Sequence, residues 1–425
     1  MIRSIFTNFS VRLAVAVINF VMLLLTTHYL GKDIRGEIAT IQLGINIIHM
    51  VSELTGGPSL IYLVPRTRLP LLLFAGTAWS FISTAGIGAV LIAFDLIPGK
   101  YTVEVLIFAL LISLHSVNQS TLLGQQRIRL FNFLHLSQGI IQLATMIVCL
   151  FVFDLKEAWP FLYASITGYG IIYFAGLILV NRNPPPPHIA EEKPRIWLLF
   201  RNGFFTQAAS LVFMISLREN YYVLKNLTPD ENYGAVGIYS TALSLGEALL
   251  LFSTSVAAVT LSRVANTESY ATIRATVMRL SKLTIVVTAL AAIFFALLPD
   301  TFYAWLLGKD FHTVGNVFNA IAPGIVLISF GTIYGHYFSG TGKHYMNFIS
   351  GLCALIAAFL FSAPLIARYN VIGAGWAATI AYTTTALVIF LLFMLSGKRG
   401  EWKLLLPSSE DFLFISNFLR RSPVK

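Results

Sequence analysis

Residues 71–93 read LLLFAGTAWSFISTAGIGAVLIA, an apolar run that contains no charged residue. At a rise of about 1.5 Å per residue, roughly 20 such residues in a helix match the ~30 Å thickness of the hydrocarbon core of a bilayer. Similar runs occupy residues 13–30 and 349–366. A strand of a membrane barrel would instead be short and would alternate apolar and polar residues. The run therefore predicts a membrane-spanning α-helix.

The composition extends this prediction to the whole chain. Of the 425 residues, 56% are hydrophobic and 11% are charged, whereas soluble domains carry roughly 25% charged residues. The formal net charge is +10, but the basic residues lie at the ends of apolar runs and do not form one basic module. We therefore expect membrane lipids, and no nucleic acid, as partners of this chain.

Glycine, proline and charged clusters divide the sequence into twelve predicted helices. They cover residues 10–30, 37–63, 70–94, 102–123, 132–153, 160–181, 201–225, 235–262, 281–303, 313–339, 347–367 and 373–395. No small-residue cleavage site follows the first apolar run, so we expect it to be retained as a span. The sequence thus predicts an all-α polytopic membrane protein with about twelve transmembrane helices.

Lysine and arginine are distributed unevenly between alternate connecting segments. One set of segments is rich in them, and the opposite set is poorer. The rich set holds Arg3, Arg66, Arg68, Arg127, Arg129, Arg182, Lys193, Arg195, Arg263, Arg274, Arg279, Lys282, Lys343 and the tail, and the poor set holds Lys32, Arg35, Lys100, Lys156, Lys225, Lys309 and Arg368. Because basic segments stay inside, both termini are predicted to be cytoplasmic.

A proline-rich break divides the chain. Residues 184–187 are four consecutive prolines, which favour an extended spacer. We therefore predict an N-terminal six-helix lobe over residues 1–183, a cytoplasmic linker over 184–200, a C-terminal six-helix lobe over 201–396 and a cytoplasmic tail over 397–425. The tail either forms an interfacial helix, with Ser408 and Asp411 as candidate caps, or is a loosely ordered basic segment.

The two predicted lobes resemble each other weakly. Gly36-Glu37-Ile38-Ala39 opens a helix in the first lobe, and Gly237-Ile238-Tyr239-Ser240 opens one in the second. Because each lobe has an even number of helices, both enter the membrane from the same side and form a parallel repeat. This layout is expected of transporters that move two lobes about a central cavity.

Five stretches of the sequence together resemble a known protein family. They are Tyr29-Leu30-Gly31-Lys32-Asp33-Ile34-Arg35-Gly36-Glu37, Gly124-Gln125-Gln126-Arg127-Ile128-Arg129-Leu130-Phe131-Asn132, Val236-Gly237-Ile238-Tyr239-Ser240-Thr241-Ala242 with Leu245-Gly246-Glu247, Leu307-Gly308-Lys309-Asp310-Phe311, and Ile372-Gly373-Ala374-Gly375-Trp376-Ala377-Ala378-Thr379. In order and spacing they resemble the polysaccharide flippases, bacterial exporters of lipid-linked oligosaccharides. Each stretch alone is a weak signal, because small residues are common at helix contacts in membranes.

The resemblance implies a two-lobed bundle that works by alternating access in the bacterial inner membrane. It implies a polyprenyl-pyrophosphate-linked glycan as substrate, with a polysaccharide polymerase as a candidate partner. The superfamily also contains multidrug exporters and the flippase of the peptidoglycan precursor. The absence of predicted helices beyond the twelfth argues against the latter.

Charged residues within predicted spans are the candidate site, because a charge at bilayer depth is costly unless it faces water or a partner. Arg218 is the main candidate for binding pyrophosphate, since a guanidinium stays charged and presents a fork of donors. A structural ion pair with Glu247 or Glu53 is the alternative. Arg12 is a second substrate candidate, or a topology signal that reaches the headgroups.

The acidic candidates for cation coupling or gating are Glu53, Glu247 and Glu219. We expect Glu53 and Glu247 to lie within helices, where they could carry a proton, hold Na⁺ or form a silent hydrogen bond. Adjacent helical residues point about 100° apart, so Arg218 and Glu219 should meet different neighbours. His49 precedes Glu53 by one turn, and the pair could relay protons, although a lone histidine in a helix is more often a packed core residue.

The sequence contains no phosphate-binding glycine loop, nucleophile motif or Cys/His metal spacing, so we expect a non-enzyme without a cofactor. We predict a flippase that moves lipid-linked oligosaccharides for O-antigen, capsule or exopolysaccharide assembly. The first alternative is a proton- or sodium-coupled multidrug exporter, which an acidic cavity would favour. The second is a scaffold or a sugar polymerase, against which the short predicted external loops argue.

Overall fold

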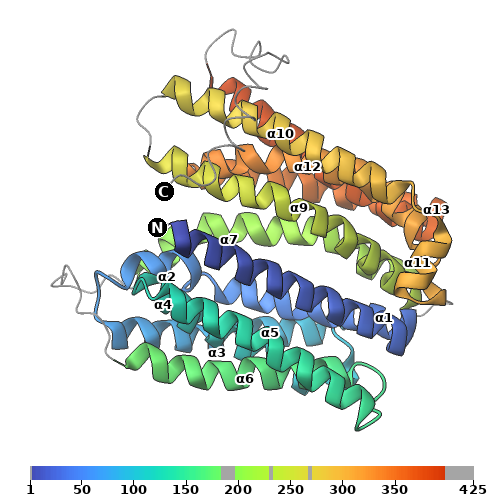
Figure 1. Cartoon of the computed structure of the whole chain (residues 1–425), viewed down its shortest axis with the longest axis horizontal. Helices are drawn as coiled ribbons and strands as arrows, with labels where there is room; N and C mark the ends of the chain where they lie inside the picture. The colour runs from blue at the N-terminus through green and yellow to red at the C-terminus, as the bar shows by residue number, and fades with distance from the viewer. Residues whose placement is uncertain (1, 183–196, 229–232, 267–269, 398–425) are drawn as a thin grey trace. The chain divides into compact units, whose positions relative to one another are not determined.

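The computed structural model describes residues 2–182, 197–228, 233–266 and 270–397, and no described residue lies in a β-strand (Figure 1). The all-α prediction is confirmed. The α-helices are α1 (Ile2–Ser52), α2 (Gly57–Leu63), α3 (Leu69–Ala93), α4 (Thr102–Gly124), α5 (Ile128–Phe151), α6 (Trp159–Asn181), α7 (Trp197–Arg218), α8 (Asn220–Leu227), α9 (Gly234–Asn266), α10 (Tyr270–Ala296), α11 (Asp300–Leu307), α12 (Val314–Gly340) and α13 (His344–Leu395). Two 3₁₀ turns are η1 (Gly99–Tyr101) and η3 (Lys309–Phe311).

Nine of the described helices are long and apolar enough to cross a membrane. Two of them, α1 and α13, each combine two predicted spans, because the backbone leaves helical geometry only at Gly31 and at Asn370. The predicted span 201–225 corresponds to α7 followed by α8. Each predicted span therefore overlaps one or two helices, and the chain is a multi-pass membrane protein.

Some predicted boundaries are wrong. The helix predicted over 281–303 is two helices, since α10 begins at Tyr270 and ends at Ala296, and α11 begins at Asp300. Pro299 explains the break, because proline has no N–H to donate and restricts the residue before it. The helix predicted over 37–63 is also interrupted, between Ser52 and Gly57. Most of the predicted linker, and the tail beyond Gly397, lie outside the described residues.

The chain divides into two compact units. Unit 1 comprises Met1–Leu211, Pro229–Gly237 and Ala304–Phe311, and unit 2 comprises Val212–Thr228, Ile238–Tyr303 and His312–Lys425. In unit 1, α1 contacts α3, α4 and α5, and α6 packs on α4 and α5. In unit 2, α12 packs against both α10 and α13. The lobe boundaries drawn from the sequence stay a prediction.

Each unit has its own apolar core. In unit 1, Ile38 and Ile41 of α1 pack with Val105 of α4 and Leu162 of α6. The core of unit 2 is more aromatic, with its rings drawn from α12 and α13. It includes Tyr334, Tyr337, Phe338 and Phe393. Buried side chains of this kind fix which face of each helix points inward.

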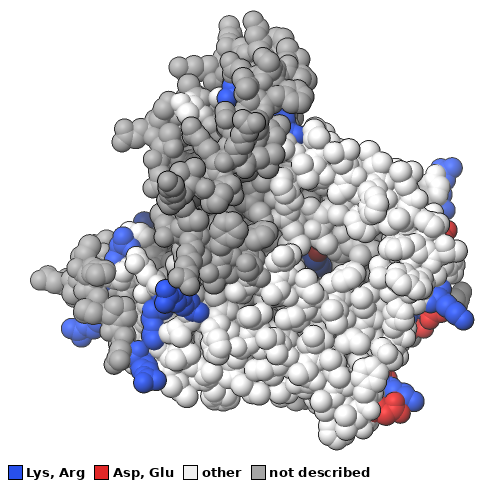
Figure 2. All heavy atoms as spheres, viewed as in Figure 1, with Lys and Arg blue, Asp and Glu red and all other residues white. Residues whose placement is uncertain are grey.

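The outward faces of the helices are apolar as well. Phe74 is 72% exposed and Leu290 is 65% exposed, and many other large hydrophobic residues are exposed as well. On the face shown in Figure 2, charged side chains gather near the helix ends, and the broad middle band is almost uncharged. An apolar surface of this extent would be unstable in water, so it is the surface that contacts lipid tails.

Candidate functional site

Arg218 and Glu247 form an ion pair inside unit 2. Arg218 is the last residue of α7, and Glu247 lies in the middle of α9, as predicted. Arg218 Nη2 lies 3.1 Å from both carboxylate oxygens of Glu247. The side chains remain 22% and 33% exposed. The structure thus contains the ion pair that the sequence left open as an alternative to a substrate contact, and both side chains of the pair are partly exposed.

Glu219 faces a different neighbour, as the helical geometry predicts. It lies between α7 and α8, and the hydroxyl of Ser362 on α13 donates a hydrogen bond to its Oε1. Its other carboxylate oxygen, Oε2, is buried and has no hydrogen-bond partner among the described residues. Arg218 and Glu219 are adjacent in sequence, yet only Arg218 belongs to the pair with Glu247.

Asn220 and Tyr239 fix the backbone around these two residues. Asn220 Nδ2 donates to the hydroxyl of Tyr239 over 3.2 Å. That hydroxyl donates to the carbonyl of Leu217 over 2.9 Å. Both side chains are fully buried. Their pairing could not be predicted, because an asparagine and a tyrosine in apolar helices carry no distinct pattern.

Glu53 is the main acidic candidate in unit 1, and its predicted location within a helix is wrong. α1 ends at Ser52, and Glu53 begins a turn that leads to α2. Gly57, with a φ of +48°, and Pro58 account for the break, because the former takes a left-handed conformation and the latter opens a new helix. The hydroxyl of Ser116 on α4 donates to Glu53 Oε1.

The two glycines of this turn leave room for the carboxylate. A Cβ atom on Gly56 or Gly57 would lie 2.7 Å from an oxygen of Glu53. Trp79 Nε1 on α3 donates to the carbonyl of Val51 over 2.9 Å and holds the end of α1. The carboxylate of Glu53 thus lies against the backbone of Gly56 and Gly57, where a side chain would not fit.

His49 lies in the last turn of α1, next to Glu53. The carbonyl of His49 accepts the backbone N–H of Glu53 at 2.9 Å. Its Nδ1 atom is buried without a hydrogen-bond partner among the described residues. His115 on α4 lies near His49 of α1 and His135 of α5. Its neighbours come from α1 and α5, which spacing along one helix could not reveal.

Arg12 lies in α1, and its side chain lies outside the part of the structure that is described. Its proposed contact with substrate therefore remains a prediction. No group of three or more His, Cys, Asp or Glu residues suited to a metal ion occurs within the described ranges.

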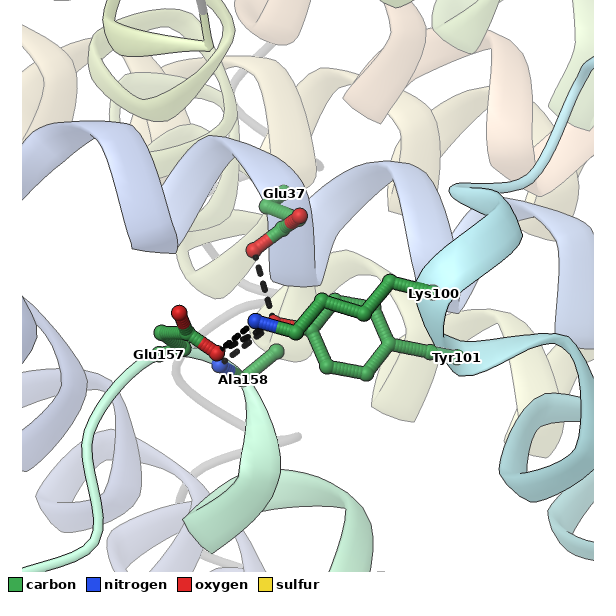
Figure 3. A network of polar contacts seen from close by, with 5 residues as sticks. All are labelled: Glu37, Lys100, Tyr101, Glu157 and Ala158. Atoms are coloured by element: carbon green, nitrogen blue, oxygen red, sulfur yellow. Dashed lines mark hydrogen bonds and ion pairs between the residues drawn. The ribbon is translucent and has the colours of Figure 1, made fainter.

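A polar network joins α1 to the starts of α4 and α6 in unit 1 (Figure 3). Tyr101 donates from its hydroxyl to Glu37 of α1 over 3.2 Å, and the same oxygen accepts the N–H of Ala158 at 3.4 Å. Lys100 forms an ion pair with Glu157. The hydrogen bond from Lys100 lowers the pKa of the Glu157 carboxyl below its ordinary range. This network ties the starts of α4 and α6 to α1, and it holds no candidate substrate residue.

A repeated tetrapeptide also meets itself in unit 1. Leu-Gly-Lys-Asp occurs at residues 30–33 and again at 307–310, and both of its glycines have positive φ, 77° at Gly31 and 108° at Gly308. A Cβ on Gly31 would lie 3.6 Å from an oxygen of Asp310. The sequence analysis assigned the two segments to separate loops. The identical tetrapeptide in both segments was the sequence signal that could have predicted their contact.

No protein-family model matches this sequence, and no curated protein matches it by sequence. Solved structures do match. The lipid II flippase MurJ in an inward closed conformation superposes with a TM-score of 0.67 at 14% identity, covering 99% of each chain. An inward-facing MATE multidrug transporter of the MOP superfamily gives 0.69 at 12% identity, covering 98% of this chain and 99% of the other. A MATE transporter of Vibrio cholerae gives 0.61 at 13% identity, with 93% and 96% covered.

The coverage corrects one inference from the sequence. Extra helices were expected to separate a lipid II flippase from this chain, but this chain covers 99% of the solved flippase. Helix number therefore provides no argument against that branch. The chain has the fold shared by the lipid II flippase and the MATE transporters of the MOP superfamily.

Proposed function

We propose that this protein is a flippase that reorients a polyprenyl-pyrophosphate-linked oligosaccharide across the bacterial inner membrane for surface polysaccharide assembly. Two independent lines support it. The fold is that of a solved flippase for a lipid-linked precursor over nearly the whole chain, and the five sequence stretches resemble polysaccharide flippases. The distribution of lysine and arginine supports cytoplasmic termini. A polysaccharide polymerase remains a candidate partner.

The observation that carries the proposal is the state of Arg218. An arginine within a membrane bundle keeps its charge, and its planar fork suits two phosphate oxygens. Here one nitrogen of the fork, Nη2, contacts both carboxylate oxygens of Glu247 at 3.1 Å, and the pair is partly exposed. A pyrophosphate headgroup offers two oxygens to two nitrogens of the guanidinium and carries more negative charge than one carboxylate. In the proposal it displaces Glu247 from Arg218, and Glu247 holds the guanidinium in place when the substrate is absent.

The acidic candidates take supporting roles. Glu247 acts as the gate on Arg218, while Glu53 with His49 and Ser116 forms a second polar site in unit 1 that could bind a coupling cation. Arg12 contributes a second positive charge for the headgroup. Reorientation makes and breaks no covalent bond, so the chain acts as a transporter and not as an enzyme.

A proton- or sodium-coupled multidrug exporter is the rival function, and one observation favours it. Glu247 is 33% exposed, and a cationic drug could bind it in place of Arg218. The MATE likeness is as good as the flippase likeness. Deleting the gene separates the two functions. Loss of surface polysaccharide with unchanged resistance to cationic dyes supports the flippase, and the opposite result supports the exporter.

The role of Arg218 is tested by a double substitution. Arg218→Ala should abolish polysaccharide export at normal protein level, but a structural ion pair would give the same loss. Removing both charges, with Arg218→Ala and Glu247→Gln together, leaves no unpaired buried charge. If the ion pair had only a structural role, this double variant should recover export. We expect the double variant to fold and still not export. Restored export in the double variant would contradict substrate binding by Arg218.

A further inference from the structure

Glu219 carries a buried carboxylate oxygen that has no hydrogen-bond partner among the described residues. The side chain is 6% exposed. Ser362 donates to Oε1, while Oε2 is buried and receives no hydrogen bond from any described residue. The next residue repeats the pattern, since Asn220 Oδ1 is also buried without a donor. Two buried acceptor oxygens on consecutive residues thus have no hydrogen-bond donor among the described residues.

The neighbouring positive charge does not compensate Glu219. Arg218 directs its guanidinium to Glu247, and none of the ion pairs among the described residues includes Glu219. The other titratable groups around this region are tyrosines: Tyr221 on α8, Tyr239 on α9 and Tyr382 on α13. Tyrosines are neutral near pH 7. An ionised Glu219 would therefore be a buried carboxylate with half of its hydrogen-bonding capacity unused, which is strongly unfavourable.

We propose that Glu219 is a proton-binding site that couples proton uptake to the binding of the anionic substrate headgroup. In the neutral form, the proton resides on Oε2 and Oε1 accepts from Ser362. Release gives a carboxylate and a hydronium ion in water. A Na⁺ ion is the less suitable ligand, because hard cations require several oxygen ligands, and here one hydroxyl, that of Ser362, contacts the carboxylate.

The direction of coupling follows from the local charges and rests on the proposed function. With Glu219 neutral, Arg218 and Glu247 sum to zero, and a pyrophosphate that displaces Glu247 meets no further negative charge. With Glu219 ionised, one residue from Arg218, the sum is −1 and the headgroup is repelled. Proton and substrate therefore stabilise each other's binding, by the same factor in both directions.

Glu219 lies where its charge can affect the packing of two helices. It separates α7 from α8, and its carbonyl accepts the N–H groups of Tyr222 and Val223 at 3.0 and 3.2 Å. Ser362 lies on α13, which packs against α8. A change in the charge of Glu219 therefore alters the contact between two helices of unit 2 as well as the field at Arg218.

Infrared difference spectroscopy of the purified full-length protein tests the proton directly and needs no substrate. A protonated carboxyl gives a carbonyl stretch above the amide band that shifts in D₂O. We expect this band in the wild type at pH 7 and its loss in Glu219→Gln, while Glu247→Gln, which removes an ion-paired carboxylate, retains it. Ser362→Ala should shift the band, which provides a readout if Glu219→Gln does not fold. A spectrum without a band attributable to Glu219, or a band replaced on adding Na⁺, would overturn the proposal.

Binding of a polyprenyl pyrophosphate tests the coupling. We expect affinity to weaken as pH rises through the titration of Glu219, by up to tenfold per pH unit for one linked proton, and Glu219→Gln to remove this dependence. Affinity independent of pH in the wild type would overturn the coupling. A wild type that binds no pyrophosphate lipid at any pH would contradict the flippase function and leave the infrared result standing.

Discussion

Gly36 and Gly237 pack against each other with no room for a side chain on either residue. A Cβ on Gly36 would lie 1.9 Å from the carbonyl oxygen of Tyr233, and a Cβ on Gly237 would lie 1.9 Å from that of Lys32. Each glycine thus meets the carbonyl four residues before the other. These are the positions that the predicted repeat treats as equivalent, and a reciprocal contact is what a local twofold axis between two such helices would produce.

Gly36→Ala should destabilise the protein by about 1–3 kcal/mol, since the clash is with backbone and cannot be relieved by a rotamer change. Gly237→Ala should behave alike. The matched control is Gly86→Ala in α3, where no atom lies within 4 Å of the added Cβ. The control should be neutral or stabilising by about 0.5–1 kcal/mol because alanine favours helix. Thermal unfolding in detergent measures the difference, and equal midpoints for Gly36→Ala and Gly86→Ala would refute the close packing.

Arg274 should be essential for stability and not for substrate binding. It is 1% exposed in α10, donates to the carbonyl of Phe393 over 2.8 Å and to Ser396 Oγ over 3.2 Å, and lies 3.7 Å above the Phe393 ring. It therefore caps the C-terminal end of α13. Arg274→Lys keeps the charge but loses the fork, and we expect a loss of roughly 1.5–3 kcal/mol per charged hydrogen bond removed.

The measurement for Arg274 is the unfolding midpoint together with pyrophosphate affinity of the folded fraction. Ser396→Ala serves as the milder companion, because it removes one acceptor and leaves the carbonyl of Phe393 in place. A variant of Arg274 with normal stability and reduced affinity would show that the residue has been assigned the wrong role.

Asn370→Gly should stabilise unit 2. Asn370 interrupts α13 with φ 52° and ψ −133°, a region populated almost entirely by glycine and costing about 1–3 kcal/mol otherwise. Glycine relieves this strain, and we expect a gain of about 1 kcal/mol after its greater flexibility when unfolded is counted. Asn370→Val should have the opposite effect.

The companion residue for this test is Gly373, whose added Cβ would lie 2.0 Å from the carbonyl oxygen of Leu365 across the same kink. Gly373→Ala should therefore destabilise. If Asn370→Gly lowered the unfolding midpoint, the side chain of Asn370 would be contributing more than the strain costs.

The Lys100 and Glu157 pair should make stability depend on pH in acid. Because the pKa of Glu157 is lowered below its ordinary 4.5 when folded, the pair stabilises the protein above that value and loses this effect as pH falls through the lowered pKa. Lys100→Met should thus reduce the unfolding midpoint near pH 7 and have little effect in stronger acid.

Lys156→Met is the control for this pair, since Lys156 and Asp154 are 3.8 Å apart with side chains 79% and 85% exposed, and such pairs contribute little. Were the difference between Lys100→Met and wild type constant with pH, the ion pair would not be its cause.

The fold class follows from the amino-acid sequence alone. Runs such as residues 71–93 identify spans because hydropathy is a local property and a bilayer admits only structures whose backbone hydrogen bonds are internal. Local chemistry also predicted that Arg218 and Glu219 diverge. Boundaries failed where a single residue ended a helix, as Pro299 does, and where α1 stops before Glu53.

Tertiary structure alone decided which charges are paired. Arg218 could have met Glu53 or Glu247, and the choice depends on how α7 and α9 are rotated about their axes and packed. The same packing set Ser362 beside Glu219 and Ser116 beside Glu53, contacts that join residues 143 and 63 positions apart. Pairing across such separations depends on neighbouring helices, and no periodicity within one helix encodes it.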